Sequence, residues 1–98
     1  MPKMYFALKM IAPRASFMLD MTEAEKNIMQ QHVLYWRQLM AQGYILVYGP
    51  VLDPKGVYGL GIAAVDDEEQ VRQLMEKDPA NGLNTYEWHP MRAVVPEK

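Results

Sequence analysis

Apolar residues fall on both faces of three short segments of this chain, residues 3–11, 44–50 and 57–65. Each segment is predicted to be a β-strand, because successive side chains of a strand point to opposite faces of its sheet. In the first segment, Phe6 would face one side of the sheet and Ala7 the other. A sheet built from such strands has two faces to bury.

A fourth strand is predicted over residues 83–95. It carries Pro90, which has no backbone N–H group for a sheet ladder. Proline in a strand is confined to edges and bulges, so we expect this strand at an edge of the sheet or beside a bulge.

Residues 21–43 have the spacing and the end signals of an amphipathic helix. Thr22 and Glu25 form a capping-box pattern at its start, and Gly43 suits the left-handed position just past its end. Its apolar residues recur at intervals of three and four, which places them on one stripe. That stripe consists of Ile28, Met29, His32, Tyr35, Trp36, Leu39 and Met40.

Residues 66–77 are predicted to be a second helix, with Asp66 as its N-cap and Glu69 reaching back to the cap. The segment 51–56 contains Asp53, a proline and a glycine, which is the chemistry of a hairpin turn. The segment 12–20 is expected to be a loop.

These elements follow one another in the order βαββαβ within one domain, residues 1–98. That order predicts a ferredoxin-like α+β fold, an antiparallel sheet with both helices on one face. The open face of such a sheet is usually polar, yet these strands are apolar on both faces. We therefore expect two copies to pack face to face as a dimeric α+β barrel.

Composition narrows the classes of partner and the compartment. The net charge of −2 offers no basic stripe for a phosphate backbone, which argues against nucleic acid. The chain has no cysteine, so a cytoplasmic location is expected. Residues 1–14 lack the pattern of a signal peptide, and no apolar run approaches the length of a membrane span.

His32 is the first candidate for chemistry, because it lies in the middle of the apolar stripe of the first helix. It is either a core histidine whose ring nitrogens are satisfied or a general acid–base group at a pocket between helix and sheet. Imidazole exchanges protons readily near neutral pH, which suits the second role.

Asp78 is the second candidate, because it follows the second helix directly, where the helix dipole disfavours a negative charge. It is either a solvated acid in an Asp-Pro turn or a carboxylate held toward a partner. In this fold the end of one helix can approach the middle of the other. Asp78 could then orient the ring of His32 and stabilise its cation.

The chain resembles the YCII-related (YciI-like) family over nearly its whole length. The resemblance is carried by the helical His32, by Gly49-Pro50 after the second strand, and by Asp78-Pro79 after the second helix. It implies a ferredoxin-like fold, dimerisation into an α+β barrel, and His32 with Asp78 as the proposed active-site pair. A dehydrochlorinase-like step on a chlorinated hydroxyquinone is the enzymatic example that the family offers.

Other residues are weaker candidates for binding a substrate. Arg14 could clamp an anion or be an ordinary exposed arginine, and Tyr35 could line a pocket or belong to the core. Tyr48 precedes Gly49-Pro50 at a strand end, where its hydroxyl could reach a cleft. Two distant histidines and scattered acids do not predict a metal site, and no cofactor is expected.

Two functions remain open from the sequence. The first is a small cofactor-independent enzyme, of isomerase or lyase type, in which His32 and Asp78 act as acid–base pair on a small, anionic, cyclic or enolisable substrate. The second is a non-catalytic ligand-binding or interaction module in which the same pair is structural.

Overall fold

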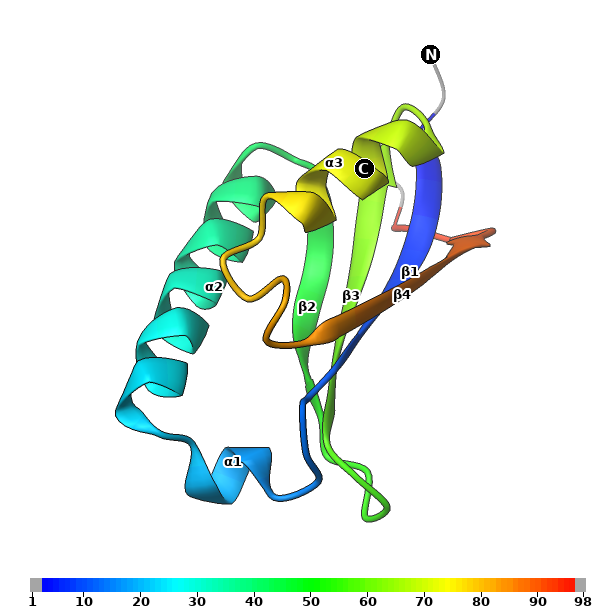
Figure 1. The fold of residues 1–98 in the computed structure, drawn as a ribbon. Coiled ribbons are helices and arrows are strands. Elements are labelled where there is room, and N and C mark those ends of the chain that lie inside the picture. The colour runs from blue at the N-terminus through cyan, green and yellow to red at the C-terminus, as the bar shows by residue number, and fades with distance from the viewer. Residues whose placement is uncertain (1–2, 97–98) are drawn as a thin grey trace.

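A computed structural model describes residues 3–96 as one antiparallel sheet with helices on one face (Figure 1). The strands are β1 (Met4–Ile11), β2 (Ile45–Val51), β3 (Tyr58–Val65) and β4 (Thr85–Met91). Their order in the sheet is β2-β3-β1-β4, with every neighbouring pair antiparallel. This order and the βαββαβ connectivity confirm the predicted ferredoxin-like α+β fold.

The two main helices are α2 (Glu23–Ala41) and α3 (Glu68–Glu76), and both lie on the same side of the sheet (Figure 1). The predicted capping box at the start of α2 is present: the Thr22 hydroxyl accepts from the N–H of Glu25, whose carboxylate accepts from the N–H of Thr22. Gly43 follows the helix at φ +90°, which confirms its predicted left-handed conformation.

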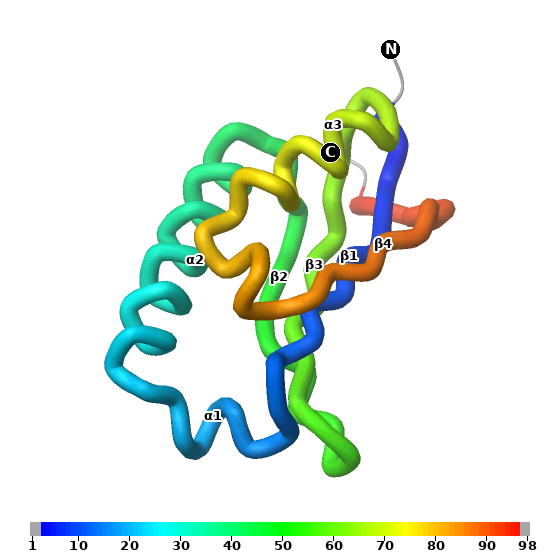
Figure 2. Tube along the Cα trace, viewed as in Figure 1, coloured from blue at the N-terminus to red at the C-terminus, as the bar shows by residue number. Residues whose placement is uncertain are grey.

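The hydrophobic core lies between the helices and the inner face of the sheet. Its largest fully buried side chains include Phe6 and Leu8 of β1, on the central part of the sheet. Trp36 and Leu39 pack onto them from α2, and Val71 and Met75 from α3. The tube in Figure 2 shows the chain after α3 turning back toward α2 before it enters β4.

Two predicted boundaries were wrong. The N-cap of α3 is Asp67 rather than Asp66, because the side chain of Asp67 accepts from the N–H of Gln70 while Gln70 in turn accepts from the N–H of Asp66. The last strand spans only Thr85–Met91, because its partner β1 runs from Met4 to Ile11 and Tyr5 already pairs with Met91.

The expected loop over residues 12–20 contains a short helix, α1 (Phe17–Asp20). The Ser16 hydroxyl and the Arg14 guanidinium both donate to the Asp20 carboxylate, and Phe17 is buried. These contacts close a single turn that hydrophobic periodicity could not reveal. Pro90 lies on β4, which is an edge strand as predicted.

Candidate functional site

His32 and Asp78 are in direct contact. His32 extends from the middle of α2, and Asp78 lies in the turn that follows α3. The ring nitrogen Nδ1 of His32 lies 2.9 Å from Oδ2 and 3.0 Å from Oδ1 of the Asp78 carboxylate. The two residues are 46 positions apart in the chain, so tertiary packing alone brings them together.

The Asp78 carboxylate is fully buried and surrounded by donors. The indole N–H of Trp36 and the hydroxyl of Tyr86 both donate to Oδ2, and the backbone N–H of Ala80 donates to Oδ1 at 2.8 Å. These groups come from α2, β4 and the Asp-Pro turn. They compensate the unfavourable place of an acid at a helix C-terminus, because hydrogen bonds to a charged acceptor are strong.

The surroundings of Asp78 favour its ionised form. Burial by itself raises the pKa of a carboxyl group, but the hydrogen bonds from His32, Tyr86 and Ala80 outweigh burial and hold the pKa of Asp78 below its usual value. Burial and the bond to Asp78 raise the pKa of Tyr86, so its phenol stays protonated and remains a donor. The ionised Asp78 therefore accepts the Nδ1–H of His32.

Two carboxyl groups away from the His32–Asp78 pair, those of Asp20 and Glu25, also have lowered pKa values. Arg14 donates to both oxygens of Glu25, at 2.8 and 2.9 Å, and lowers the pKa of Glu25 to about 2. Hydrogen bonds from Ser16 and Arg14 lower the pKa of Asp20. Three carboxyl groups thus bind protons more weakly in the folded chain than in the unfolded chain.

We expect the free energy of unfolding to fall as the pH drops below about 4. A carboxyl group with a lowered folded-state pKa stabilises the fold above its unfolded pKa, and this contribution is lost as pH falls through the folded value. Urea unfolding between pH 2.5 and 6 would measure how the free energy of unfolding depends on pH. The double variant Asp20→Asn/Glu25→Gln should keep part of this dependence, because Asp78 still contributes to it. A flat profile below pH 4 in that variant would contradict the assignment to Asp78.

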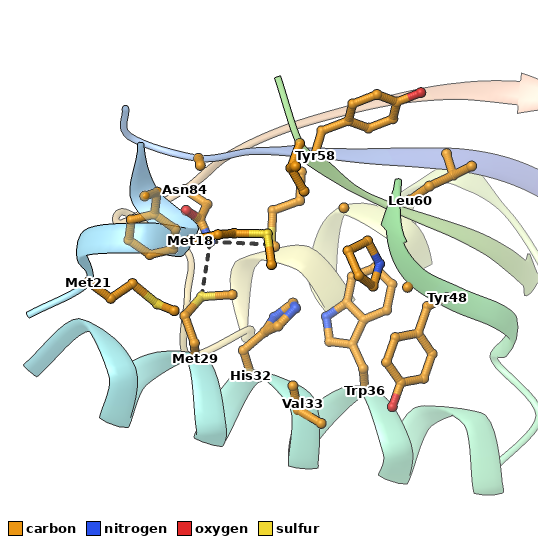
Figure 3. Close-up of a pocket in the computed structure, with 17 residues that line it drawn as sticks. Met18, Met21, Met29, His32, Val33, Trp36, Tyr48, Tyr58, Leu60 and Asn84 are labelled. Carbon is orange, nitrogen blue, oxygen red and sulfur yellow. Dashed lines mark hydrogen bonds between the residues drawn. The ribbon is translucent and has the colours of Figure 1, made fainter. Parts of the chain in front are cut away.

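A cavity of about 230 Å³ lies beside the ring of His32, between α2 and the sheet. Figure 3 shows His32 and Trp36 rising from α2 into this space, with Met29 and Val33 from the same helix. The lining is mainly apolar and consists of Met10, Ala12, Phe17, Met18, Met21, Met29, His32, Val33, Trp36, Tyr48, Gly49, Pro50, Val57, Tyr58, Gly59, Leu60 and Asn84.

The ring of His32 lines this cavity, and only one of its two nitrogens is bonded within residues 3–96. Nδ1 is occupied by Asp78, and Nε2 forms no hydrogen bond with any group in residues 3–96. Since the neutral ring donates through Nδ1, Nε2 carries a lone pair. The site therefore combines a proton acceptor with an apolar space that a small molecule can occupy.

Gly61 on β3 allows Trp36 to reach Asp78. A Cβ atom at position 61 would collide with the Trp36 indole ring. The ring also packs at 5.5 Å between centroids against Tyr48, and at 5.3 Å against His32. A residue without a side chain is thus required where the indole passes close to the strand.

Three of the five predicted substrate-binding residues line the cavity: Tyr48, Gly49 and Pro50. Tyr35 lies elsewhere, because its hydroxyl donates to the backbone carbonyl of Leu74 at 2.7 Å and joins α2 to α3. Burial and the negative charge of Asp78 raise the pKa of Tyr35.

Arg14 is bonded to its acidic neighbours and does not belong to the cavity lining. Its guanidinium donates to both carboxylate oxygens of Glu25 and to the side chain and carbonyl of Asp20. Arg14 thereby connects α1 to the first turn of α2. The structure places it as a link between these segments, outside the set of residues that line the cavity.

Sequence reasoning missed Tyr86 and Asn84. Tyr86 alternates with Trp88 along β4, and both positions pair with inward-facing residues of β1, Met10 and Leu8. That alternation is the signal that could have placed Tyr86 on the helix side. Asn84 precedes β4 in a turn, where no periodicity applies.

Residues 3–96 contain neither a metal-ligand cluster nor a membrane-spanning helix. The structure groups no three or more His, Asp or Glu side chains that could hold a metal ion there. Among the helices of this part of the chain, none has the length and apolar character needed to cross a bilayer.

The fold and the site define a small ferredoxin-like α+β protein with a buried His–Asp pair beside an apolar cavity. The chain belongs to the YCII-related domain family, whose family model matches residues 4–94. This confirms the resemblance that the sequence motifs indicated. No curated protein matches the chain.

Proposed function

We propose that this protein is a small cofactor-independent enzyme in which His32 is the general acid–base residue, of isomerase or lyase type. One observation supports this proposal above the others: Asp78 occupies Nδ1 of His32, while Nε2 is left without a partner at the wall of an apolar cavity. Proton abstraction requires a positioned base beside a space that the substrate can occupy.

Asp78 would serve His32 in two ways. Its ionised carboxylate accepts Nδ1–H, which fixes the ring in the tautomer with a basic Nε2. When Nε2 takes a proton from the substrate, the same carboxylate stabilises the imidazolium cation. The side chain of Asp78 is 0% exposed, so water does not weaken this electrostatic contact.

The cavity supports a single-ring substrate with an acidic C–H or O–H group. A cavity of about 150 Å³ can hold benzene, so 230 Å³ holds a six-membered ring with small substituents. The apolar walls would exclude water from the carbanion or enolate that forms. Enolisation, isomerisation and elimination of a leaving group beside the acidic carbon all fit this arrangement.

The deciding experiment is solvent deuterium exchange into a panel of cyclic enolisable compounds, such as cyclohexenones and lactones. The proposal requires that the protein accelerates exchange and that His32 is needed for it. Equal exchange rates for the parent and a His32 variant would overturn it.

A ligand-binding or interaction module with a structural His–Asp pair is the second candidate. The observation that favours it is the complete burial of Asp78 among donors from three segments, as in a pair that holds helices together. In that case the cavity would bind a ligand without changing it, and His32 variants would alter stability but no reaction.

We also propose that two copies pair through the open face of the sheet. Val47, Ile62 and Ala7 form one row across β2, β3 and β1, on the side opposite the helices, and Val47 is 58% exposed. An apolar row on an uncovered sheet face favours burial against a second copy.

We further propose a cytoplasmic location, which rests on the cysteine-free sequence.

Light scattering should give about twice the chain mass of 11.3 kDa for the parent. Val47→Lys should give the monomer mass, because it places a charge in the proposed interface. Leu52→Lys, in the β2–β3 turn, is the matched control and should leave the dimer intact. A parent that stays monomeric at about 100 µM would refute the proposed pairing.

A further inference from the structure

Asn84 is buried at the cavity without adequate hydrogen-bond partners. It is 3% exposed, and its backbone N–H donates to the carbonyl of Ala80 at 2.9 Å. Its side-chain Oδ1 has no hydrogen-bond partner within residues 3–96. Its Nδ2 reaches only the sulfur atoms of Met10 and Met29, at 3.3 and 3.4 Å, as the dashed lines in Figure 3 show.

The fold itself gains little from this amide. A thioether sulfur is a weak acceptor, and a buried amide oxygen without a donor is unfavourable. Buried polar groups of native proteins are nearly always satisfied, so an exception in the wall of a cavity calls for a role. An apolar side chain of similar size would serve packing at this position equally well.

The position of Asn84 relative to His32 is informative. Met29, which contacts the amide, lies three residues before His32 on α2, and three residues advance a helix by about 4.5 Å. Asn84 and His32 therefore belong to the lining of one cavity, and Met29, which contacts the amide, lies about one helical turn from His32. The thioethers of Met10 and Met29 are flexible and can move aside for a ligand.

The charge of the lining limits the ligand further. Within the described set of lining residues there is neither lysine nor arginine, and Arg14 is occupied by Asp20 and Glu25. An anion would therefore lose its hydration without gaining a cationic partner in the apolar cavity. An uncharged ligand with one polar group avoids that loss.

We propose that Asn84 is the specificity-determining residue of the cavity, which selects an uncharged single-ring ligand by hydrogen-bonding its hydroxyl or carbonyl group. An amide donates and accepts, so it suits either group. The inference rests on the proposed use of the cavity as the substrate site. It adds that the polar group of the substrate is held at Asn84 while the reacting carbon lies against Nε2 of His32.

Phenol and toluene are suitable probes, because they have nearly the same shape and differ in one hydroxyl group. Their dissociation constants would be measured by NMR titration for the parent and for Asn84→Leu. Loss of one neutral hydrogen bond in a buried site should weaken phenol binding about tenfold. Toluene binding should stay the same or become tighter.

Asn81→Leu is the matched control, since Asn81 lies in the same turn and outside the residues that line the cavity. It should change neither affinity. Asn84→Leu should melt no lower than the parent, because it removes an unsatisfied amide. If it does not fold, Asn84→Met gives the same comparison with a flexible side chain.

Unchanged phenol affinity in Asn84→Leu, or an equal loss for both probes, would overturn the role of Asn84. If His32-dependent deuterium exchange persists in that case, the proposed acid–base function stands alone. Failure of the parent to bind either probe would overturn both the role of Asn84 and the proposed acid–base function, because the cavity would then not be a ligand site.

Discussion

Replacing Asp78 with asparagine is expected to lower the free energy of unfolding by about 3–5 kcal/mol. The carboxylate accepts hydrogen bonds from His32, Trp36, Tyr86 and the N–H of Ala80, and its side chain is 0% exposed. Asparagine has a single acceptor oxygen, and its NH₂ group would face other donors. Several buried polar groups would lose their partner at once.

Urea unfolding at pH 7 measures this loss directly. Asp66→Asn is the matched control, because Asp66 is an exposed acid that pairs with Lys3 at 3.2 Å. That substitution should change stability by no more than about 0.5 kcal/mol. A loss below about 1 kcal/mol for Asp78→Asn would show that the buried cluster does not hold α3 against α2.

Replacing His32 with asparagine is expected to slow deuterium exchange into an accepted cyclic substrate by roughly 10²–10⁴-fold. The amide of asparagine can occupy the position of Nδ1 and donate to Asp78, but it offers no base at the position of Nε2. The variant should therefore fold with Asp78 still partnered, and its defect should lie in the rate constant rather than in substrate binding.

His89→Asn provides the control for the His32 variant. His89 is the second histidine of the chain and lies exposed on β4, so its replacement should leave exchange unchanged. Exchange would be followed by proton NMR in D₂O at pH 7, with circular dichroism to show that each variant is folded. A His32→Asn variant as active as the parent would exclude His32 as the base.

The two variants together separate the proposed enzyme from a binding module. In an enzyme, His32→Asn keeps most of the stability and loses the reaction, whereas Asp78→Asn loses stability as well as the reaction. In a binding module, both variants alter only stability and ligand affinity. Because His32 and Asp78 are in contact, the effects of a double variant should not add.

The local elements of the fold were predictable because their signals lie within a few residues of each other. The capping box of Thr22 and Glu25 and the turn at Asp53 depend only on neighbouring side chains and backbone groups. Strand pairing followed from the βαββαβ order, since this order permits few arrangements. The contact of His32 with Asp78 was expected from side-by-side helices and from the family motifs.

Two other local features were not predictable in the same way, because neither periodicity nor propensity distinguishes them. The single turn of α1 exists because Asp20 accepts from Arg14 and Ser16 while Phe17 is buried. The shift of the N-cap to Asp67 depends on which of two adjacent acids meets the first free N–H groups. Propensity differs too little between such neighbours to decide the boundary.

The strands, the two main helices, their order and the two residues most suited to proton transfer followed from the sequence pattern. The packing of segments far apart in the chain established three other features: Trp36 and Tyr86 complete the surroundings of Asp78, Gly61 leaves space for the indole, and Arg14 is bonded elsewhere. The physical reason is that a buried charge is satisfied by whichever donors the packing of β4 and α2 brings within about 3 Å. Sequence spacing does not contain that distance.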